Sequence, residues 1–377
     1  MIGALALLGY AATAAWCAPA LLVPLAGRGL SARAGLAAWL VAMASVLAAA
    51  GLALESSLTT VAADWPRLTQ TLCRSIAGDA CTPAVYESAF YQAGVAALAI
   101  ALTAGTALAA WRYGRRVQRS RRQTRAHAEA ARIVGRDLPW PAADGDLPPF
   151  AAVRRLAQRA ATANRAATAN LAGAVVLDDP RPAAYCVGGR PAAIVITSGA
   201  LALLEPPQLR AVLAHERAHL AQGHNALSTV TRGLAATFPA VPLFARGSTE
   251  IARLAEMSAD DTAARAVGRP ALAAALLAIA TGARYPVTGL TGLPADGQAP
   301  VPAGQAPGPA GTHGALAGPP PHALPRGAMA ATAYAVPARV ERMLCPPRPA
   351  AALAVATALA ALSALLALAP AAIAIVS

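Results

Sequence analysis

Residues 214–219 read Ala-His-Glu-Arg-Ala-His, which is the pattern HExxH within a stretch rich in helix-forming residues. On a helix, residues four positions apart lie on one face, about one turn from each other. His215 and His219 can therefore direct ring nitrogens at a single Zn²⁺, and Glu216 can reach a water molecule on that ion. Because zinc lowers the pKa of such a water toward about 7, a neighbouring carboxylate can accept its proton. The stretch predicts a catalytic site with one zinc ion per chain.

The third metal ligand must come from outside this stretch, because a catalytic zinc site usually has three protein ligands and one open position. His224 is near in sequence, but the metzincin pattern needs Gly at 222 and His at 225, where this chain has Gln222 and Asn225. Glu256 begins an ExxxD pattern on the next predicted helix, and we favour it as the third ligand. Asp260 is expected to accept a hydrogen bond from a ligand imidazole and so fix its tautomer.

An isolated HExxH also occurs on exposed helix faces, where it binds no metal. Two observations favour the zinc site here. The chain has only six His, of which two belong to the motif, and a second helix with carboxylates follows it. We expect no role for the three His that lie far from the motif, which are His127, His313 and His322.

The composition indicates a membrane protein. Hydrophobic residues make up 56% of the chain and charged residues 13%, against about 25% charged residues in ordinary soluble domains. A membrane-spanning helix needs about 20 apolar residues. Four segments meet this requirement, at about residues 2–25, 35–54, 93–111 and 350–375.

The arginines predict the orientation, since Lys and Arg are retained on the cytoplasmic side. Arg28 and Arg33 lie between the first two spans. Seven more follow the third span, at Arg112, Arg115, Arg116, Arg119, Arg121, Arg122 and Arg125. The N-terminus is then outside the cell membrane. Residues 1–111 form a membrane domain, 112–349 a cytoplasmic domain and 350–377 the last span.

All 31 basic residues are Arg, and the formal net charge is +13. This bias, with abundant Ala, Gly and Pro, is typical of a GC-rich genome, and the arginines beside an apolar run indicate orientation in the membrane, so we expect no direct nucleic-acid binding. Residues 112–136 are expected to form a basic helix near anionic lipid.

The cytoplasmic domain is predicted to be α+β. Short β-type runs cover residues 174–177, 183–187 and 193–197, and helices cover 206–224 and 249–267. Residues 226–244 suit either a hairpin at the membrane surface or a buried helix. Residues 285–327 are rich in Pro, Gly and Ala, which is typical of a flexible insert.

An extended peptide substrate commonly adds as a strand to a sheet edge. Residues 185–187 or 194–197 are candidates for such an edge, and packing strands are the alternative. Cys186 in the first run is expected to be a buried small side chain. Cys73 and Cys81 lie in the predicted external loop, where a disulfide and two free thiols both remain open.

The chain resembles the BlaR/MecR-type membrane metallopeptidases, which are antirepressor gluzincins. The matching residues are 213–219, then Glu256 to Asp260, and then residues 339–344, which read Arg-Val-Glu-Arg-Met-Leu. The order of three spans, a protease domain and one span also matches. The implied fold is an α-helical membrane protein with four transmembrane helices and a cytoplasmic α+β gluzincin-like zinc metallopeptidase domain.

The resemblance implies cleavage of a cytoplasmic protein, such as a winged-helix transcriptional repressor, in signal transduction. The penicillin-binding sensor domain of antibiotic-sensing members is not expected here, because the sequence stops at Ser377 and has no Lys for an SxxK motif. Two alternatives remain open: an HtpX-like quality-control protease and a non-catalytic sensor or scaffold. An intramembrane site-2-type protease is disfavoured, because the last span contains no Asp. Arg339 and Arg342 are candidate donors to the oxyanion.

Overall fold

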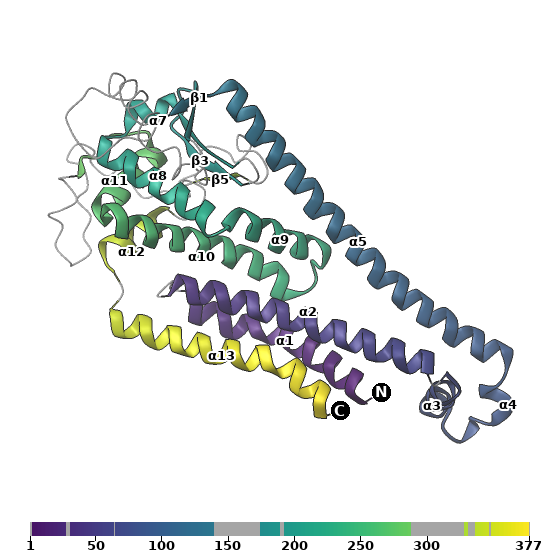
Figure 1. Ribbon diagram of the computed structural model, residues 1–377. Helices are drawn as coiled ribbons and strands as arrows, with labels where there is room; N and C mark the ends of the chain where they lie inside the picture. Colours follow the sequence, from purple (N-terminus) through teal and green to yellow (C-terminus); the bar gives the residue numbers. More distant parts are fainter. Residues whose placement is uncertain are drawn as a thin grey trace, which may run out of the picture. The chain divides into compact units, whose positions relative to one another are not determined.

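The computed structural model describes residues 2–27, 31–63, 65–138, 174–188, 192–287, 328–330, 336–346 and 348–376. The chain divides into two compact units. The first comprises residues 1–118, 231–251 and 353–377, and the second comprises residues 119–230 and 252–352. Figure 1 shows the ribbon and labels most of the helices and strands.

Four helices in the described part of the chain are long and apolar enough to cross a membrane. They are α1 (Ile2–Gly27), α2 (Ala32–Ala63), α5 (Ala89–Val134) and α13 (Pro349–Val376). Each contains one of the predicted apolar segments. The crossing itself and its direction stay predictions.

Helix α5 joins the third predicted span to the basic segment that follows it. No Pro occurs between residues 89 and 134, so nothing forces the helix to end at the change from apolar to basic sequence. Leu98, Ile100 and Leu102 are each more than half exposed in the apolar part. Such exposure suits a helix that contacts lipid, since lipid tails are as apolar as these side chains.

Polar contacts join three of the apolar helices in the first unit. The hydroxyls of Tyr10 on α1 and Ser45 on α2 donate to the carbonyl oxygen of Leu366 on α13, at 3.1 and 2.6 Å. A hydroxyl in apolar surroundings needs such a partner, because burying it unpaired costs free energy. The two contacts therefore favour one packing of α1, α2 and α13.

The first unit also contains the beginning of α10 (Pro242–Val267). A Cβ atom at Gly247 would lie 2.9 Å from a ring atom of Trp39, which is fully buried on α2. Glycine therefore permits the close approach of α10 to α2. The stretch predicted as a surface hairpin or buried helix forms all but the first two residues of α9 (His224–Thr237), a turn, and the first residues of α10.

Between α2 and α5 lie three short elements: α3 (Trp65–Ala77), η1 (Gly78–Ala80) and α4 (Pro83–Tyr86). Cys73 and Cys81 form a disulfide across the first two, which decides the question that the sequence left open. Gly78 has a φ of 53°, a left-handed conformation that Gly adopts without strain.

The second unit contains a mixed sheet of five strands in the order β1-β2-β4-β3-β5. The strands are β1 (Arg136–Leu138), β2 (Ala174–Leu177), β3 (Ala184–Val187), β4 (Ala193–Thr197) and β5 (Ala328–Ala330). β2 and β4 are parallel, and the other pairs are antiparallel. All residues of β3 and β4 are buried, as the apolar runs in the sequence predict.

Of the two interpretations left open for residues 185–187 and 194–197, the described sheet supports packing strands. β4 lies between β2 and β3, and β3 pairs with β5 on its other side, with Cys186 opposite Met329. The sequence could not reveal this, because β5 is only three residues long and lies far along the chain. Cys186 itself is fully buried, as expected.

The second unit also contains four whole helices, which are α7 (Ser198–Leu203), α8 (Pro206–Ala221), α11 (Arg269–Thr281) and α12 (Val336–Leu344). Parts of α5, α9, α10 and α13 complete it. α8 starts at a capping box between Glu205 and Gln208. It ends before His224, contrary to the prediction, because Gly223 adopts a left-handed φ of 67° and a new helix then begins. α10 begins at Pro242, seven residues before the predicted start at 249.

Most of the predicted flexible insert lies outside the described residues, which stop at 287 and resume at 328. His313 and His322 lie in this gap. The apolar core of the second unit is nevertheless closed by residues from beyond the insert. Val340 and Met343 of α12 pack with Leu272 and Leu276 of α11.

Candidate metal centre

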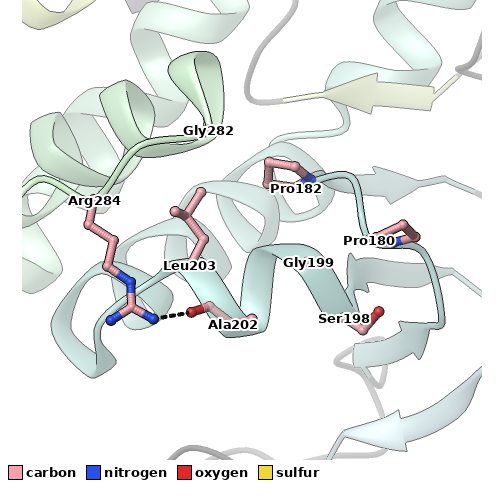
Figure 2. Close-up of a pocket in the computed structure, with 8 residues that line it drawn as sticks. All are labelled: Pro180, Pro182, Ser198, Gly199, Ala202, Leu203, Gly282 and Arg284. Carbon is pink, nitrogen blue, oxygen red and sulfur yellow. Dashed lines mark hydrogen bonds between the residues drawn. The ribbon is translucent and has the colours of Figure 1, made fainter.

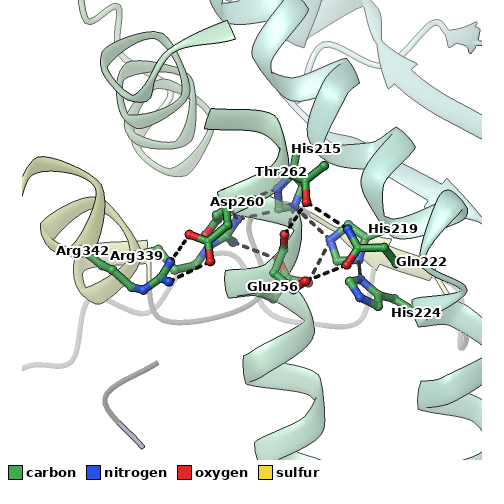
Figure 3. A network of polar contacts seen from close by, with 11 residues as sticks. His215, His219, Gln222, His224, Glu256, Asp260, Thr262, Arg339 and Arg342 are labelled. Carbon is green, nitrogen blue, oxygen red and sulfur yellow. Dashed lines mark hydrogen bonds and ion pairs between the residues drawn. The ribbon is translucent and has the colours of Figure 1, made fainter. Parts of the chain in front are cut away.

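Two histidines of α8 and one glutamate of α10 meet at a buried point in the second unit (Figure 3). His215 Nε2 and His219 Nε2 lie 3.0 Å apart, as the helical spacing predicts. Each of these nitrogens lies 3.5 Å from one oxygen of the Glu256 carboxylate. One ligand atom from each of the three residues lies within 4.8 Å of the others. The structure thus brings together the three residues that the sequence proposed as ligands.

The donor set fits zinc. Two imidazoles and a carboxylate occur in catalytic zinc sites that keep one position open for water or substrate. His215 and His219 are fully buried and Glu256 is 4% exposed. Burying such groups together costs free energy unless their charges are compensated, which a divalent ion does.

Asp260 lies one turn beyond Glu256 on α10. Its Oδ1 is 3.1 Å from His215 Nδ1, the ring nitrogen opposite the one that faces Glu256. Figure 3 shows Asp260 on the far side of the His215 ring from His219. The placement is that of a carboxylate beside a metal-binding imidazole, at a short N–O distance but without the angles of a good hydrogen bond.

Glu216 is fully buried next to the three residues. Among the described residues, neither of its carboxylate oxygens makes a hydrogen bond of good geometry. Burial raises the pKa of this carboxyl above its ordinary value, although His215 and His219 act in the opposite direction. A buried carboxylate with free acceptor capacity is suited to taking a proton from a water molecule.

Arg339 of α12 supplies a buried cation to the site, with 2% of its surface exposed. Its Nε and Nη2 donate to the two oxygens of Asp260 at 2.7 and 2.6 Å, and its Nη1 lies 3.0 Å from Glu256 Oε2. The sequence suggested Arg339 only as an oxyanion donor. The structure instead directs its guanidinium at two carboxylates of the site.

Arg342, the other oxyanion candidate, pairs with Asp261 at 2.7 and 2.8 Å. This second pair is less buried, with the arginine side chain 13% and the aspartate side chain 34% exposed. This ion pair joins α12 to α10. None of the contacts described for Arg342 is with His215, His219 or Glu256.

The charges shift the proton affinities of the site. Burial acts to lower the pKa of His215, but hydrogen bonds to Asp260 and Glu256 outweigh it and raise the pKa to about 9. Burial acts to raise the pKa of Asp260, but Arg339 outweighs it and lowers the pKa to about 2. The pKa of Glu256 is also well below its usual range, because His219 and Arg339 oppose the effect of burial. Both acids of the ExxxD pattern are therefore ionised at neutral pH.

Residues 149–238 match peptidase family M48. This segment includes β2, β3, β4, α7, α8 and α9, and therefore the HExxH motif, but it stops before Glu256. No curated protein and no solved structure gives a significant match. The M48 match and the three converging residues together support a metallopeptidase of the gluzincin type. Neither observation distinguishes the BlaR/MecR type from other gluzincins.

A polar link between Gln222, inside the M48 segment, and two residues beyond it joins α8 to α10. Gln222, which follows the last turn of α8, accepts a hydrogen bond from Ser258 at 2.6 Å and donates one to Thr262 at 3.1 Å. Ser258 and Thr262 lie one turn apart on the helix that carries Glu256. The sequence gave no signal for this link, because Gln222 was considered only as a departure from the metzincin pattern.

His224 lies next to the site without belonging to the group of three. Its Nδ1 is 2.9 Å from Nδ1 of His219, on the opposite edge of that ring from Glu256. The spacing argument that excluded His224 as a metzincin-type ligand therefore agrees with its position. His127 lies on α5, where its Nε2 is 3.2 Å from the hydroxyl of Tyr185.

A pocket of about 470 Å³ lies elsewhere in the second unit, between the turn that precedes β3, helix α7 and the residues that follow α11 (Figure 2). Its walls include Pro180, Pro182 and Leu203, and the Arg284 side chain closes one side by donating to the carbonyl oxygen of Ala202 at 2.9 Å. None of the metal-facing residues lines this pocket.

Proposed function

We propose that this chain is a membrane-bound, zinc-dependent endopeptidase that cleaves cytoplasmic protein. The observation that carries the proposal is the convergence of His215, His219 and Glu256 from two helices, with Glu216 buried beside them. The match to peptidase family M48 over the segment that contains HExxH supports the reaction class. The four apolar helices support attachment to a membrane.

In this proposal His215, His219 and Glu256 hold one zinc ion, and Asp260 keeps His215 in the tautomer that binds through Nε2. When bound, zinc supplies a Lewis acid that makes a water molecule more acidic and polarises a peptide carbonyl. Glu216 accepts a proton from the attacking water. As the carbon–nitrogen bond breaks, Glu216 returns that proton to the leaving nitrogen, so its charge is restored at the end of the cycle.

The site of action and the substrate are proposed from the distribution of arginines and from the resemblance. With the N-terminus outside, residues 112–349 lie in the cytoplasm, where a winged-helix transcriptional repressor is the proposed substrate. The sheet has no free edge at β3 or β4 among its described pairings. A substrate peptide therefore cannot pair with either strand while the observed sheet is intact.

The decisive variant is Glu216→Gln, measured in the full-length chain in lipid nanodiscs. We expect it to abolish cleavage of an added substrate protein while zinc remains bound, because the amide keeps the shape of the side chain but cannot accept the proton. Glu129→Gln is the matched control, since Glu129 is exposed on α5 within the same unit. Persistent cleavage by Glu216→Gln would remove the basis of the proposed mechanism.

The same preparation separates the two alternatives. A quality-control protease of the HtpX-like kind would cleave many unfolded proteins, whereas a regulatory protease would cleave one partner at a defined bond. A non-catalytic sensor would show no cleavage in the wild-type chain even with zinc bound. Comparing cleavage of denatured casein with cleavage of a repressor encoded beside this chain distinguishes the three.

A further inference from the structure

The two metal-facing imidazoles have different partners at their second nitrogen. His215 Nδ1 faces the Asp260 carboxylate, at 3.1 Å. His219 Nδ1 faces another imidazole, with Nδ1 of His224 at 2.9 Å. The rings of His219 and His224 are nearly perpendicular, at 74°, with their centroids 4.9 Å apart. They therefore meet edge-on through their nitrogen atoms and do not stack.

The local backbone places His224 at this position. The last turn of α8 carries His219, and Gly223, with a left-handed φ of 67°, separates α8 from α9. His224 is the first residue of α9 and is 2% exposed, so its ring lies under the end of α8. This break between the two helices precedes His224, whose Nδ1 lies 2.9 Å from Nδ1 of His219, five positions earlier.

The chemistry of a neutral imidazole fixes the direction of this hydrogen bond. A neutral ring carries one proton, so one nitrogen donates and the other offers a lone pair. His219 Nε2 faces His215 and Glu256, and it must offer its lone pair to bind a metal. The His219 proton is then on Nδ1, and His224 Nδ1 must accept it.

We propose that His224 is a positioning residue that fixes the tautomer and the ring orientation of His219 for zinc binding. The inference rests on the proposed function and extends it to a residue outside the three ligands and Asp260. Each ligand ring is then held by an acceptor at its Nδ1. The acceptor is the Asp260 carboxylate for His215 and the neutral His224 imidazole for His219. Partners of this kind affect metal affinity by about 10- to 100-fold.

Two substitutions of similar size test the proposal in the full-length chain. In His224→Asn the amide oxygen occupies nearly the position of Nδ1 and can accept the same proton. In His224→Leu no acceptor remains, so the Nδ1–H group of His219 is buried without a partner. We expect His224→Leu to weaken zinc binding by about 10- to 100-fold and His224→Asn to recover most of the loss.

Zinc affinity is measured by competition with a chelator, and the coordination geometry by the visible absorption spectrum of the cobalt-substituted protein. His127→Leu is the matched control, because His127 also bonds through one ring nitrogen but faces Tyr185. It should leave both readouts unchanged. A role of His224 in packing alone would change thermal stability without changing the cobalt spectrum.

Wild-type affinity and spectrum in His224→Leu would overturn the inference, as would equal losses in the Leu and Asn variants. If His224→Leu does not fold, ring ¹⁵N shifts of the zinc-loaded wild-type chain decide. A protonated Nδ1 on His219 supports the proposal, and a protonated Nδ1 on His224 overturns it. A wild-type chain that binds no zinc would instead overturn the proposed function, and this inference with it.

Discussion

Two arginines one turn apart on α12 each form an ion pair with an aspartate, and the two pairs differ in burial. Burial decides how much each pair contributes to the stability of the fold. Arg339 bonds Asp260 with both groups 2% exposed, whereas the Asp261 partner of Arg342 is 34% exposed. Surface pairs contribute about 0–1 kcal/mol, because water screens them. Removing one partner of a buried pair costs about 3–5 kcal/mol, because the other charge is left uncompensated.

We therefore expect Arg339→Met to lower the free energy of unfolding of the metal-free protein by about 3–5 kcal/mol. Arg342→Met should lower it by about 0–1 kcal/mol. Denaturant titration of both variants, followed by circular dichroism, measures the difference. Equal losses would show that Arg339 does not compensate the carboxylates of the site.

Zinc binding should depend on pH through His215. Before an ion binds, the raised pKa of about 9 means that both nitrogens of the His215 ring, including Nε2, carry a proton at neutral pH. The proton must leave before Nε2 can bind zinc, so lowering the pH favours the competing proton. We expect apparent zinc affinity to rise by up to about 10-fold per pH unit toward pH 9 and then to level off. Chelator competition from pH 6.5, the ordinary pKa of His, to pH 9 measures it. A flat profile would contradict this account.

At the residue scale, the sequence was informative where chemistry depends on local spacing. His215 and His219 are one helical turn apart, and Glu256 and Asp260 repeat that spacing, so each pair was predictable. The contacts of Gln222 and Arg339 were not, because they join residues distant in the chain. Arg339 reaches Asp260 across 79 positions, and no local pattern specifies such a contact.

At the scale of elements, the link through Gln222 fixes α8 relative to α10. Its loss removes two hydrogen bonds and leaves the fully buried hydroxyl of Ser258 without that partner. We expect Gln222→Ala to lower the free energy of unfolding by about 1–3 kcal/mol and to weaken zinc binding, because the two ligand-bearing helices become less fixed. Thermal unfolding and chelator competition test both effects.

Gln123→Ala serves as the control for Gln222→Ala, since Gln123 is exposed on α5. A Gln222→Ala variant that resembles this control in both measurements would show that apolar packing alone holds the two helices in register.

The elements themselves were predictable in proportion to their length and periodicity. The central strands follow from buried apolar runs, and the sequence placed β2 and β4 within the bounds observed. The three-residue strands β1 and β5 carry no such pattern and are defined by pairing with partners far along the chain. The break after α8 depends on the left-handed conformation of Gly223. The sequence did not indicate this conformation, because the residues around Gly223 favour a helix.

At the scale of the whole molecule, the predicted direction of insertion is testable with a native cysteine. The free cysteines among the described residues are Cys17, Cys186 and Cys345. Cys345 is exposed shortly before α13, on the side predicted to be cytoplasmic, whereas Cys186 is buried. Cys17 lies within α1 and is removed by Cys17→Ser.

We expect a membrane-impermeant maleimide to label Cys345 in inverted membrane vesicles and not in intact cells. Labelling is read by the mass shift of the purified chain, and Cys345→Ser supplies the background. Labelling in intact cells would reverse the proposed orientation and would place the proposed substrate on the wrong side of the membrane.

The metal centre depends on segments that span most of the second unit. α8 and α10 supply the metal-facing residues, and α12, beyond the insert, supplies Arg339. The M48 match covers only the first of these segments. The sequence therefore indicated the reaction class and the meeting of α8 with α10, while the contacts of Arg339 from α12 required the structure.

X-ray absorption at the zinc edge, measured on the purified full-length chain, tests the central claim most directly. We predict one zinc per chain with two imidazole nitrogens and a carboxylate oxygen at about 2.0–2.2 Å. Glu256→Ala should remove the protein oxygen while both imidazoles remain. A zinc content near zero, or a shell containing sulfur at about 2.3 Å, would contradict the account.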